Sequence, residues 1–200
     1  IVTMKIVTIV LGEHHDTIIG DVIGVDYGAF VCARDGISMD LACGDFDSVT
    51  AVQFKEIELH CSHIHKLNPI KDETDFKFAY SLCNEYDIIR VLGGLGRRKD
   101  HEFINIMTAI KDSRIELYDD LNKIKRYDSG SHIVNKLNYK YFSVIVLTQG
   151  FITLNGFKYP LTRREIFPFD DYLTSNEMIG DTAEIILEEA SVLVIQACDS

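Results

Sequence analysis

The stretch Leu41-Ala42-Cys43-Gly44-Asp45-Phe46-Asp47-Ser48 leads from a short apolar strand into a polar segment that carries two carboxylates. Residues i and i+2 of an extended segment point to the same side, so the sequence predicts that Asp45 and Asp47 project together beyond the strand. Two neighbouring carboxylates repel each other, and a hard cation such as Mg2+, which takes oxygen ligands, relieves that repulsion. Taken alone, the stretch is better explained as a polar turn, because Gly, Asp and Ser are common turn residues. The motifs in the rest of the chain reverse that preference.

The composition of the 200-residue chain suits one large domain or two small ones with a substantial core. Hydrophobic residues make up 46% of the chain and only three residues are proline, which argues against long disordered segments. No apolar run approaches the roughly 20 residues that are needed to cross a bilayer. The apolar start, residues 1–11, is expected to form a buried strand rather than a signal peptide.

The charge and the cysteines narrow the class of protein further. A net charge of −11 argues against non-specific nucleic-acid binding, because that binding needs a basic face to displace counterions from phosphates. The five cysteines are odd in number and form no Cys-x-x-Cys motif, so we expect free thiols in a reducing cytoplasm.

Strand and helix patterns alternate through the first half of the chain, which predicts an α/β domain. Apolar runs predict strands over 4–11, 21–25 and 87–92, and helical spacing predicts helices over 50–59, from 76 to 86, and from 103 to 110. Asp26 directly follows the second strand, and ligands lie at the carboxyl ends of strands in open α/β sheets. A helix cap is an equally good explanation of Asp26.

Two polar stretches precede predicted helices. In Lys71-Asp72-Glu73-Thr74-Asp75, either Asp72 or Thr74 is expected to cap the following helix, with Asp75 in its first turn. Taken alone, Asp75 is better explained as a carboxylate that complements the helix dipole. The three histidines and the cysteine of residues 60–65 match no structural zinc pattern, so we expect a solvated connection there.

The stretch Gly93-Gly94-Leu95-Gly96-Arg97-Arg98-Lys99-Asp100-His101 lies between a predicted strand and a predicted helix. Exposed amides at a helix start favour anions, so this order of elements is typical of phosphate binding. The stretch is neither a Walker loop nor a complete dinucleotide-binding fingerprint. We expect that Arg97 and Arg98 are not both mere surface charges.

From about Lys123 onward, short alternating runs predict an all-β module, most simply a sandwich. The expected strands are residues 131–137, 142–148, 151–154, 157–161, 182–188 and 191–197. Asn155-Gly156 predicts a hairpin turn, and Glu189-Ala190 is expected to join the last two strands as a second hairpin. Ser175-Asn176-Glu177 is expected in the loop before that last hairpin.

Five motifs, in this order, resemble those of the thiamine pyrophosphokinase family over nearly the whole chain. They are Asp26-Tyr27-Gly28-Ala29, Gly44-Asp45-Phe46-Asp47-Ser48, Lys71-Asp72-Glu73-Thr74-Asp75, Arg98-Lys99-Asp100-His101 with Asn105, and Ser175-Asn176-Glu177. Tyr27 replaces a usual glycine, and Arg97 stands where a second glycine often precedes the arginine. The chain has no tryptophan to stack on thiamine.

The resemblance implies an N-terminal α/β domain, Rossmann-like with a mostly parallel sheet, over residues 1–122, and a C-terminal all-β sandwich over residues 123–200. The first domain would bind ATP and Mg2+, and the second would bind thiamine and pair two chains into a homodimer with active sites at the subunit interface. The implied reaction transfers pyrophosphate from ATP to thiamine, giving thiamine diphosphate and AMP.

The same resemblance implies roles for individual residues. The metal ligands would be Asp45, Asp47, Asp75 and Asp100, and the catalytic residues Asp75, Asp47, Arg98 and Asp100. ATP would contact Asp26, Ser48, Arg98, His101 and Asn105, and thiamine would contact Asp75, Ser175, Asn176 and Glu177. Asp75 is the favoured acceptor of the thiamine hydroxyl proton.

Two alternatives stay open at this point. A Mg2+-dependent phosphohydrolase acting on nucleotides would use the same carboxylates, with water in place of the alcohol. A thiamine- or nucleotide-binding regulator would keep the fold without turnover. The intact set of aspartates argues against the regulator, because a binding protein does not need so many repelling charges.

Overall fold

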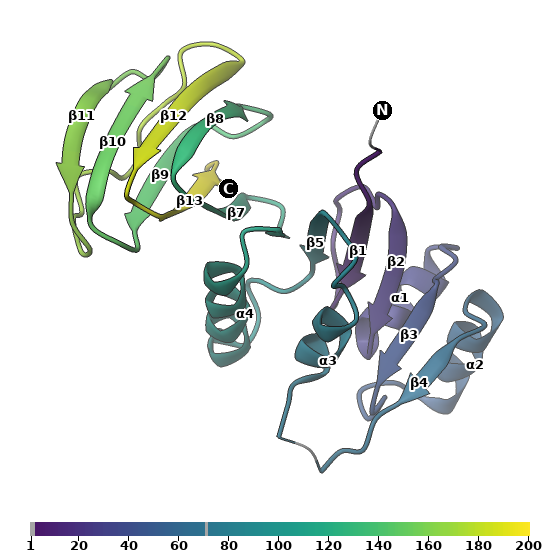
Figure 1. Cartoon of the computed structure of the whole chain (residues 1–200). Helices are drawn as coiled ribbons and strands as arrows, with labels where there is room; N and C mark the ends of the chain where they lie inside the picture. Colours follow the sequence, from purple (N-terminus) through teal and green to yellow (C-terminus); the bar gives the residue numbers. More distant parts are fainter. Residues whose placement is uncertain (1–2, 71) are drawn as a thin grey trace. The chain divides into compact units, whose positions relative to one another are not determined.

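The computed structural model describes residues 3–70 and 72–200, and the chain divides into two compact units (Figure 1). The first unit comprises Ile1–Asn105 and Glu116–Asp120, and the second comprises Ile106–Ile115 and Leu121–Ser200. The last change from the first unit to the second falls after Asp120, close to the domain boundary expected after residue 122. The segment 106–115 belongs to the second unit, where the side chain of Arg126 donates from Nη1 to Ile110 O at 2.7 Å.

The first unit contains a sheet in which the strands run in the order β4-β3-β2-β1-β5-β6. Their bounds are β1 Ile6–Val10, β2 Asp21–Val25, β3 Leu41–Gly44, β4 Ile64–Lys66, β5 Ile88–Leu92 and β6 Ile115–Tyr118. The pairs β1–β2, β2–β3, β3–β4 and β1–β5 are parallel. The strand order reverses at β1, and the carboxyl ends beside such a reversal are where ligands bind in α/β sheets. The expected α/β organisation is confirmed.

The helices are α1 Tyr27–Arg34, α2 Ala51–His60, α3 Asp75–Ser81 and α4 Lys99–Lys111. Side chains of α1 and α2 pack in one buried cluster with residues of β1, β2 and β3, so these two helices cover a shared face of the sheet. Thr50 and Gln53 form a capping box at the start of α2, as the predicted helix start requires. The third helix ends at Ser81, so the prediction that it continues to Tyr86 is wrong.

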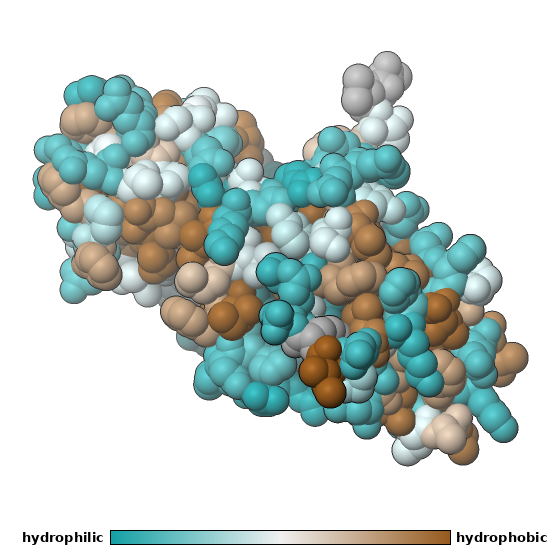
Figure 2. Space-filling model, turned by 60° about the horizontal axis from the view of Figure 1, so that its bottom comes forward, coloured by the Kyte–Doolittle hydropathy of each residue, from teal (hydrophilic) through white to brown (hydrophobic). Residues whose placement is uncertain are grey.

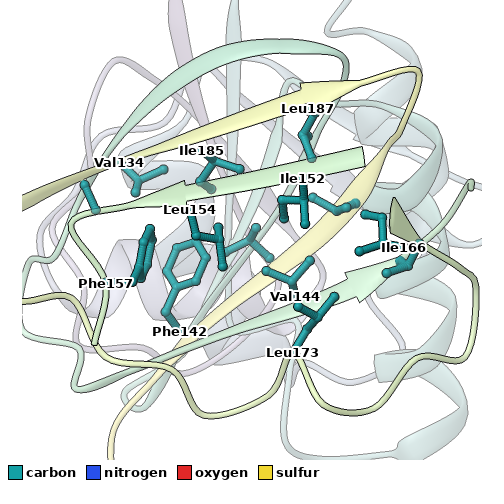
Figure 3. Packing of buried hydrophobic residues seen from close by; sticks show 14 of the residues in the cluster. Val134, Phe142, Val144, Ile152, Leu154, Phe157, Ile166, Leu173, Ile185 and Leu187 are labelled. Atoms are coloured by element: carbon teal, nitrogen blue, oxygen red, sulfur yellow. The ribbon is translucent and has the colours of Figure 1, made fainter. Parts of the chain in front are cut away.

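The second unit is a sandwich of two sheets, β7-β13-β9 and β11-β10-β12-β8. The bounds are β7 Asn122–Tyr127, β8 Gly130–Asn135, β9 Tyr141–Val146, β10 Gly150–Asn155, β11 Leu161–Ile166, β12 Thr182–Glu188 and β13 Val192–Ala197. Alternate residues of the strands point into a common core, where Phe142 and Val144 of one sheet face Ile152, Leu154 and Ile185 of the other (Figure 3). This packing confirms the predicted sandwich.

Two predicted turns of this sandwich differ from the structure. Asn155 still belongs to β10, where it pairs with Glu184, and β11 begins only at Leu161, so Asn155-Gly156 is not a two-residue hairpin. The chain after Gly156 instead bonds the segment around Glu177, with Lys158 N donating to Glu177 O at 2.8 Å. Glu189-Ala190 connects β12 of one sheet with β13 of the other, so the expected last hairpin is a crossover between sheets.

No disulfide joins the five cysteines, all of which lie in the described part of the chain, as expected. Hydrophilic side chains cover much of the face in Figure 2, with separate hydrophobic patches among them, which is ordinary for a folded protein. Among the described residues, no helix is both long enough and apolar enough to cross a membrane.

Candidate active site

The loops after β2 and β3 are locked together at the carboxyl edge of the sheet. Asp26 N donates to Cys43 O at 3.0 Å, and Asp26 Oδ1 accepts a hydrogen bond from Phe46 N at 3.0 Å. Gly44 has a φ of 143°, and a Cβ there would overlap the Asp26 carboxylate. Glycine is therefore required at this position, both for its backbone conformation and for the close approach of Asp26. Asp26 stands at the N-cap of α1, but its side chain makes no cap hydrogen bond, so the cap does not explain this residue.

Three carboxylates converge in the first unit. Oxygen atoms of Asp26, Asp45 and Asp75 all lie within 4.8 Å of one another, and the three residues are half-buried. Asp75 is the first residue of α3, and Thr74 caps that helix by accepting a hydrogen bond from Lys77 N at 3.1 Å. The predicted cap Thr74 is thus confirmed, whereas Lys71 of the same motif lies outside the described residues.

The surroundings of Asp26 raise the pKa of its carboxyl group. Burial, followed by a side-chain hydrogen bond with Asp75, raises the pKa of Asp26 to about 7, while the Phe46 amide opposes the shift. The shift means that the half-buried group tolerates a further negative charge poorly without a compensating cation. Oxygen-only ligands in this arrangement are those that a hard divalent cation takes.

The local geometry around Asp47 differs from the prediction. Phe46 has a φ of 57°, so the segment is not extended, and Asp45 and Asp47 do not project together. Instead, the backbone amide of Asp47 donates a hydrogen bond to Asp45 Oδ1 at 3.1 Å. Short aspartate side chains stabilise turns through bonds of this kind. Asp47 and Ser48 are exposed, and the group of three described carboxylates contains Asp26 in place of Asp47.

The glycine loop after β5 is held against the loop after β1. Gly93 has a φ of 72°, and a Cβ there would stand 2.6 Å from Gly12 N, so two backbones meet at this point. Asn105, which is buried, donates from Nδ2 to Gly94 O at 2.7 Å. The side chain of Asn105 therefore supports the loop backbone.

The cations and carboxylates at the start of α4 are paired with each other. Arg98 Nη2 and Nε lie 2.6 and 3.2 Å from the two oxygens of Asp100. This bond, together with the amide of His101, holds the pKa of Asp100 at about 2. Both side chains are exposed, and Asp100 does not belong to the group of three carboxylates.

Glu102 is a residue of this loop that the motifs did not single out. Its Oε2 accepts hydrogen bonds from Gly96 N at 2.7 Å and from Lys99 Nζ at 3.0 Å. Gly96 has a φ of 92°, so Glu102 fixes a loop amide that belongs to an unusual backbone conformation. A glutamate in the first turn of a helix after a glycine loop is a sequence signal that points to such a capping role.

A cavity of about 620 Å³ lies within the first unit and joins these elements. Its lining includes the predicted site residues Asp26, Ser48, Asp75, Arg98, Asp100, His101 and Asn105. Apolar side chains, among them Leu11 and Phe76, form much of the remaining wall. The cavity thus combines grouped carboxylates, arginines and an apolar surface, which suits a phosphorylated ligand with a flat ring.

The predicted thiamine-binding motif lies in the second unit and is bonded internally. Asn176 is buried, and its Oδ1 accepts from Tyr159 N at 3.0 Å and from Glu177 N at 2.9 Å. Its Nδ2 donates to Tyr159 O at 2.9 Å, so the carboxamide holds two loop segments together. Glu177 forms an ion pair of 3.0 Å with Lys158, and Ser175 is exposed with a φ of 58°.

Comparisons with known proteins match both units. Residues 15–118 match the family model of the thiamin pyrophosphokinase catalytic domain, and residues 131–192 match that of the thiamin pyrophosphokinase vitamin B1 binding domain. The thiamine pyrophosphokinase of Bacillus subtilis (strain 168) is 32% identical over 186 residues, which cover 88% of this chain and 87% of the relative.

Solved structures are similar along the whole chain. The crystal structure of the Bacillus subtilis thiamine pyrophosphokinase has a TM-score of 0.87 and 28% identity, covering 98% of this chain and 100% of that one. The structure of a thiamin pyrophosphokinase from Geobacillus thermodenitrificans has a TM-score of 0.83 and 28% identity, with 98% and 99% covered.

Proposed function

The chain belongs to the thiamin pyrophosphokinase family, and we propose how its residues carry out the reaction of that family. The enzyme transfers the pyrophosphate group of ATP to thiamine, giving thiamine diphosphate and AMP. The observation that carries the proposal is that two of the three grouped carboxylates, Asp26 and Asp75, line one cavity together with an arginine-bearing glycine loop.

We propose that Asp26, Asp45 and Asp75 hold Mg2+, which fits their grouped oxygen donors. The ion would neutralise charge on the β-phosphate as the bond to AMP breaks. Asp47 and Asp100 are proposed to complete the ligand set only when ATP is bound. Asp100 is supported in this role by its pairing with Arg98, because an incoming phosphate competes for the guanidinium and releases the carboxylate.

The transfer step mainly requires that the two substrates are positioned and that charge on the transferring group is stabilised. The hydroxyethyl oxygen of thiamine forms a bond to the β-phosphorus, and the bond from that phosphorus to the AMP oxygen breaks, with its electron pair leaving on AMP. Asp75 is proposed to accept the hydroxyl proton. Arg98 binds the transferring group or the departing AMP through its planar fork.

The remaining cavity residues have supporting roles in the proposal. Ser48 and His101 line the cavity and would donate hydrogen bonds to phosphate oxygens. Asn105 acts on ATP indirectly, by holding the glycine loop through Gly94.

The second unit is proposed to supply the thiamine site and the dimer contact. Its match to the vitamin B1 binding domain supports this, and Ser175 and Glu177 are the proposed contact residues, with Asn176 supporting their loop. We further propose a cytoplasmic homodimer whose active sites are completed by the second chain, and a Rossmann-like classification of the first unit, which its parallel strand pairs support. Mixing an Asp75→Asn chain with a Ser175→Ala, Glu177→Gln chain tests the shared site, because subunit exchange would restore one intact site.

Incubation with ATP and Mg2+, with and without thiamine, tests the function. We expect AMP to form only when thiamine is present. Release of phosphate without thiamine would indicate the hydrolase, and nucleotide binding without any turnover would indicate the regulator.

A further inference from the structure

Tyr27 lies at the wall of the cavity, directly after Asp26, as the first residue of α1. Its ring is half-buried and packs against Phe30, with the ring centroids 5.7 Å apart and the planes tilted by 54°. An aromatic side chain held beside a cavity offers a flat apolar surface to a ligand.

A chain of polar contacts fixes the ring from its far end. The Tyr27 hydroxyl donates to Glu13 Oε1 at 3.1 Å. Arg34 donates to both oxygens of Glu13, at 2.8 and 3.0 Å, and also bonds Asp35. The phenol is therefore tethered to a carboxylate that is itself held in a two-point contact, which restricts the rotation of the ring.

The chemistry around Tyr27 indicates which part of a substrate would meet it. The cavity also has apolar lining from Leu11, Val25 and Leu95, while Arg97 and Arg98 supply its positive charge. The phosphates of a nucleotide would take Arg98 and the grouped carboxylates, which leaves the apolar wall for a ring. The cavity lies in the unit that matches the catalytic domain, whereas the vitamin B1 binding match falls on residues 131–192.

We propose that Tyr27 is a substrate-binding residue that packs against the adenine ring of ATP. The proposal rests on the proposed function, because it takes ATP as the nucleotide of this cavity. The ring contributes affinity for the base and none for the phosphates, and the Glu13–Arg34 pair positions it.

Equilibrium binding of AMP and of inorganic pyrophosphate, both with Mg2+, separates the base from the phosphates. For Tyr27→Ala we expect AMP to bind about tenfold more weakly, the scale of a base stacked on an aromatic side chain. Pyrophosphate should bind as it does to the unaltered protein. Tyr27→Phe, which keeps the ring and loses only the bond to Glu13, should weaken AMP by no more than about twofold.

Three results would overturn the proposal: unchanged AMP affinity in Tyr27→Ala, equal weakening of AMP and pyrophosphate, or equal losses in Tyr27→Ala and Tyr27→Phe. Steady-state kinetics adds a fourth arm, in which KM for ATP should rise in Tyr27→Ala. A rise in KM for thiamine alone would assign the ring to the other substrate and contradict the adenine contact. Thiamine-dependent AMP formation by the unaltered protein tests the proposed function separately, so the two failures are distinguishable.

Discussion

The loop around Asp45 in the first unit and the loop around Asn176 in the second carry comparably short polar motifs, yet they use their side chains in opposite ways. At the first loop, Asp26, Asp45 and Asp75 bring carboxylates together and leave negative charge concentrated beside a cavity. At the second loop, the carboxamide of Asn176 is hydrogen-bonded to backbone groups of Tyr159 and Glu177. Grouped like charges that oppose folding indicate chemistry, whereas satisfied buried amides indicate support of the backbone.

The largest expected effect comes from Asp45→Asn. We expect kcat to fall about a hundredfold or more, the scale of losing one electrostatic contact to a transition state. The free energy of unfolding should stay the same or rise slightly, because one repelling charge is removed. Asp47→Asn is the matched comparison: Asp47 is proposed to join the ligand set only when ATP is bound, so this variant should also lower kcat but leave Mg2+ binding to the ATP-free protein unchanged, whereas Asp45→Asn should weaken that binding. Equal weakening of Mg2+ binding to the ATP-free protein in the two variants would show that the metal site includes both residues in the resting protein.

The next effect should appear in stability. Asn176→Ala leaves two backbone amides and one carbonyl without their side-chain partner, so we expect a loss of about 1–3 kcal/mol in the free energy of unfolding. Chemical denaturation measures this loss, and kcat below the melting temperature should change little. Ser175→Ala serves as the control, because its exposed hydroxyl should not affect stability. A stable Asn176→Ala variant with a raised KM for thiamine would instead make this loop a direct substrate contact.

A smaller effect is expected at the glycine loop. Arg98→Lys keeps the charge but loses the planar fork that binds Asp100 at two points, so we expect turnover to fall about tenfold. Arg97→Ala should have a minor effect on turnover. The reverse order in steady-state assays would transfer the phosphate-binding role to Arg97.

The architecture could be predicted from the sequence because the spacing of buried residues along a strand or helix, and the residues of a turn, reflect the local conformation of the chain. The apolar runs marked β1, β2 and β5, and the alternating runs marked a sandwich. β7, with the sequence Asn-Lys-Ile-Lys-Arg-Tyr, was missed because charged residues dominate it and only Ile124 is buried. The Asn155-Gly156 signal failed because Asn155 bonds Glu184 within the ladder, a contact between distant parts of the chain.

Only part of the site could be predicted, because the rest depends on one unusual backbone conformation and on contacts between distant parts of the chain. The motifs contained Asp45, Asp75 and Asp26, but the rule for extended segments paired Asp45 with Asp47 and not with Asp26. A single left-handed residue, Phe46, breaks that rule, and propensity does not place a phenylalanine there. The hydrogen bonding of the Asn176 side chain to backbone groups likewise depends on Tyr159, which lies 17 residues away in the chain.

Mg2+-dependent binding of an ATP analogue with a methylene bridge between its α- and β-phosphates tests the role of the carboxylates most directly, because that analogue cannot be cleaved at the reacting bond. Isothermal titration calorimetry would compare the unaltered protein with Asp26→Asn and Asp45→Asn, each with and without Mg2+. We expect Mg2+ to strengthen binding to the unaltered protein and to have a much smaller effect on both variants. An equal gain from Mg2+ in all three proteins would contradict the assignment of the ion to these aspartates.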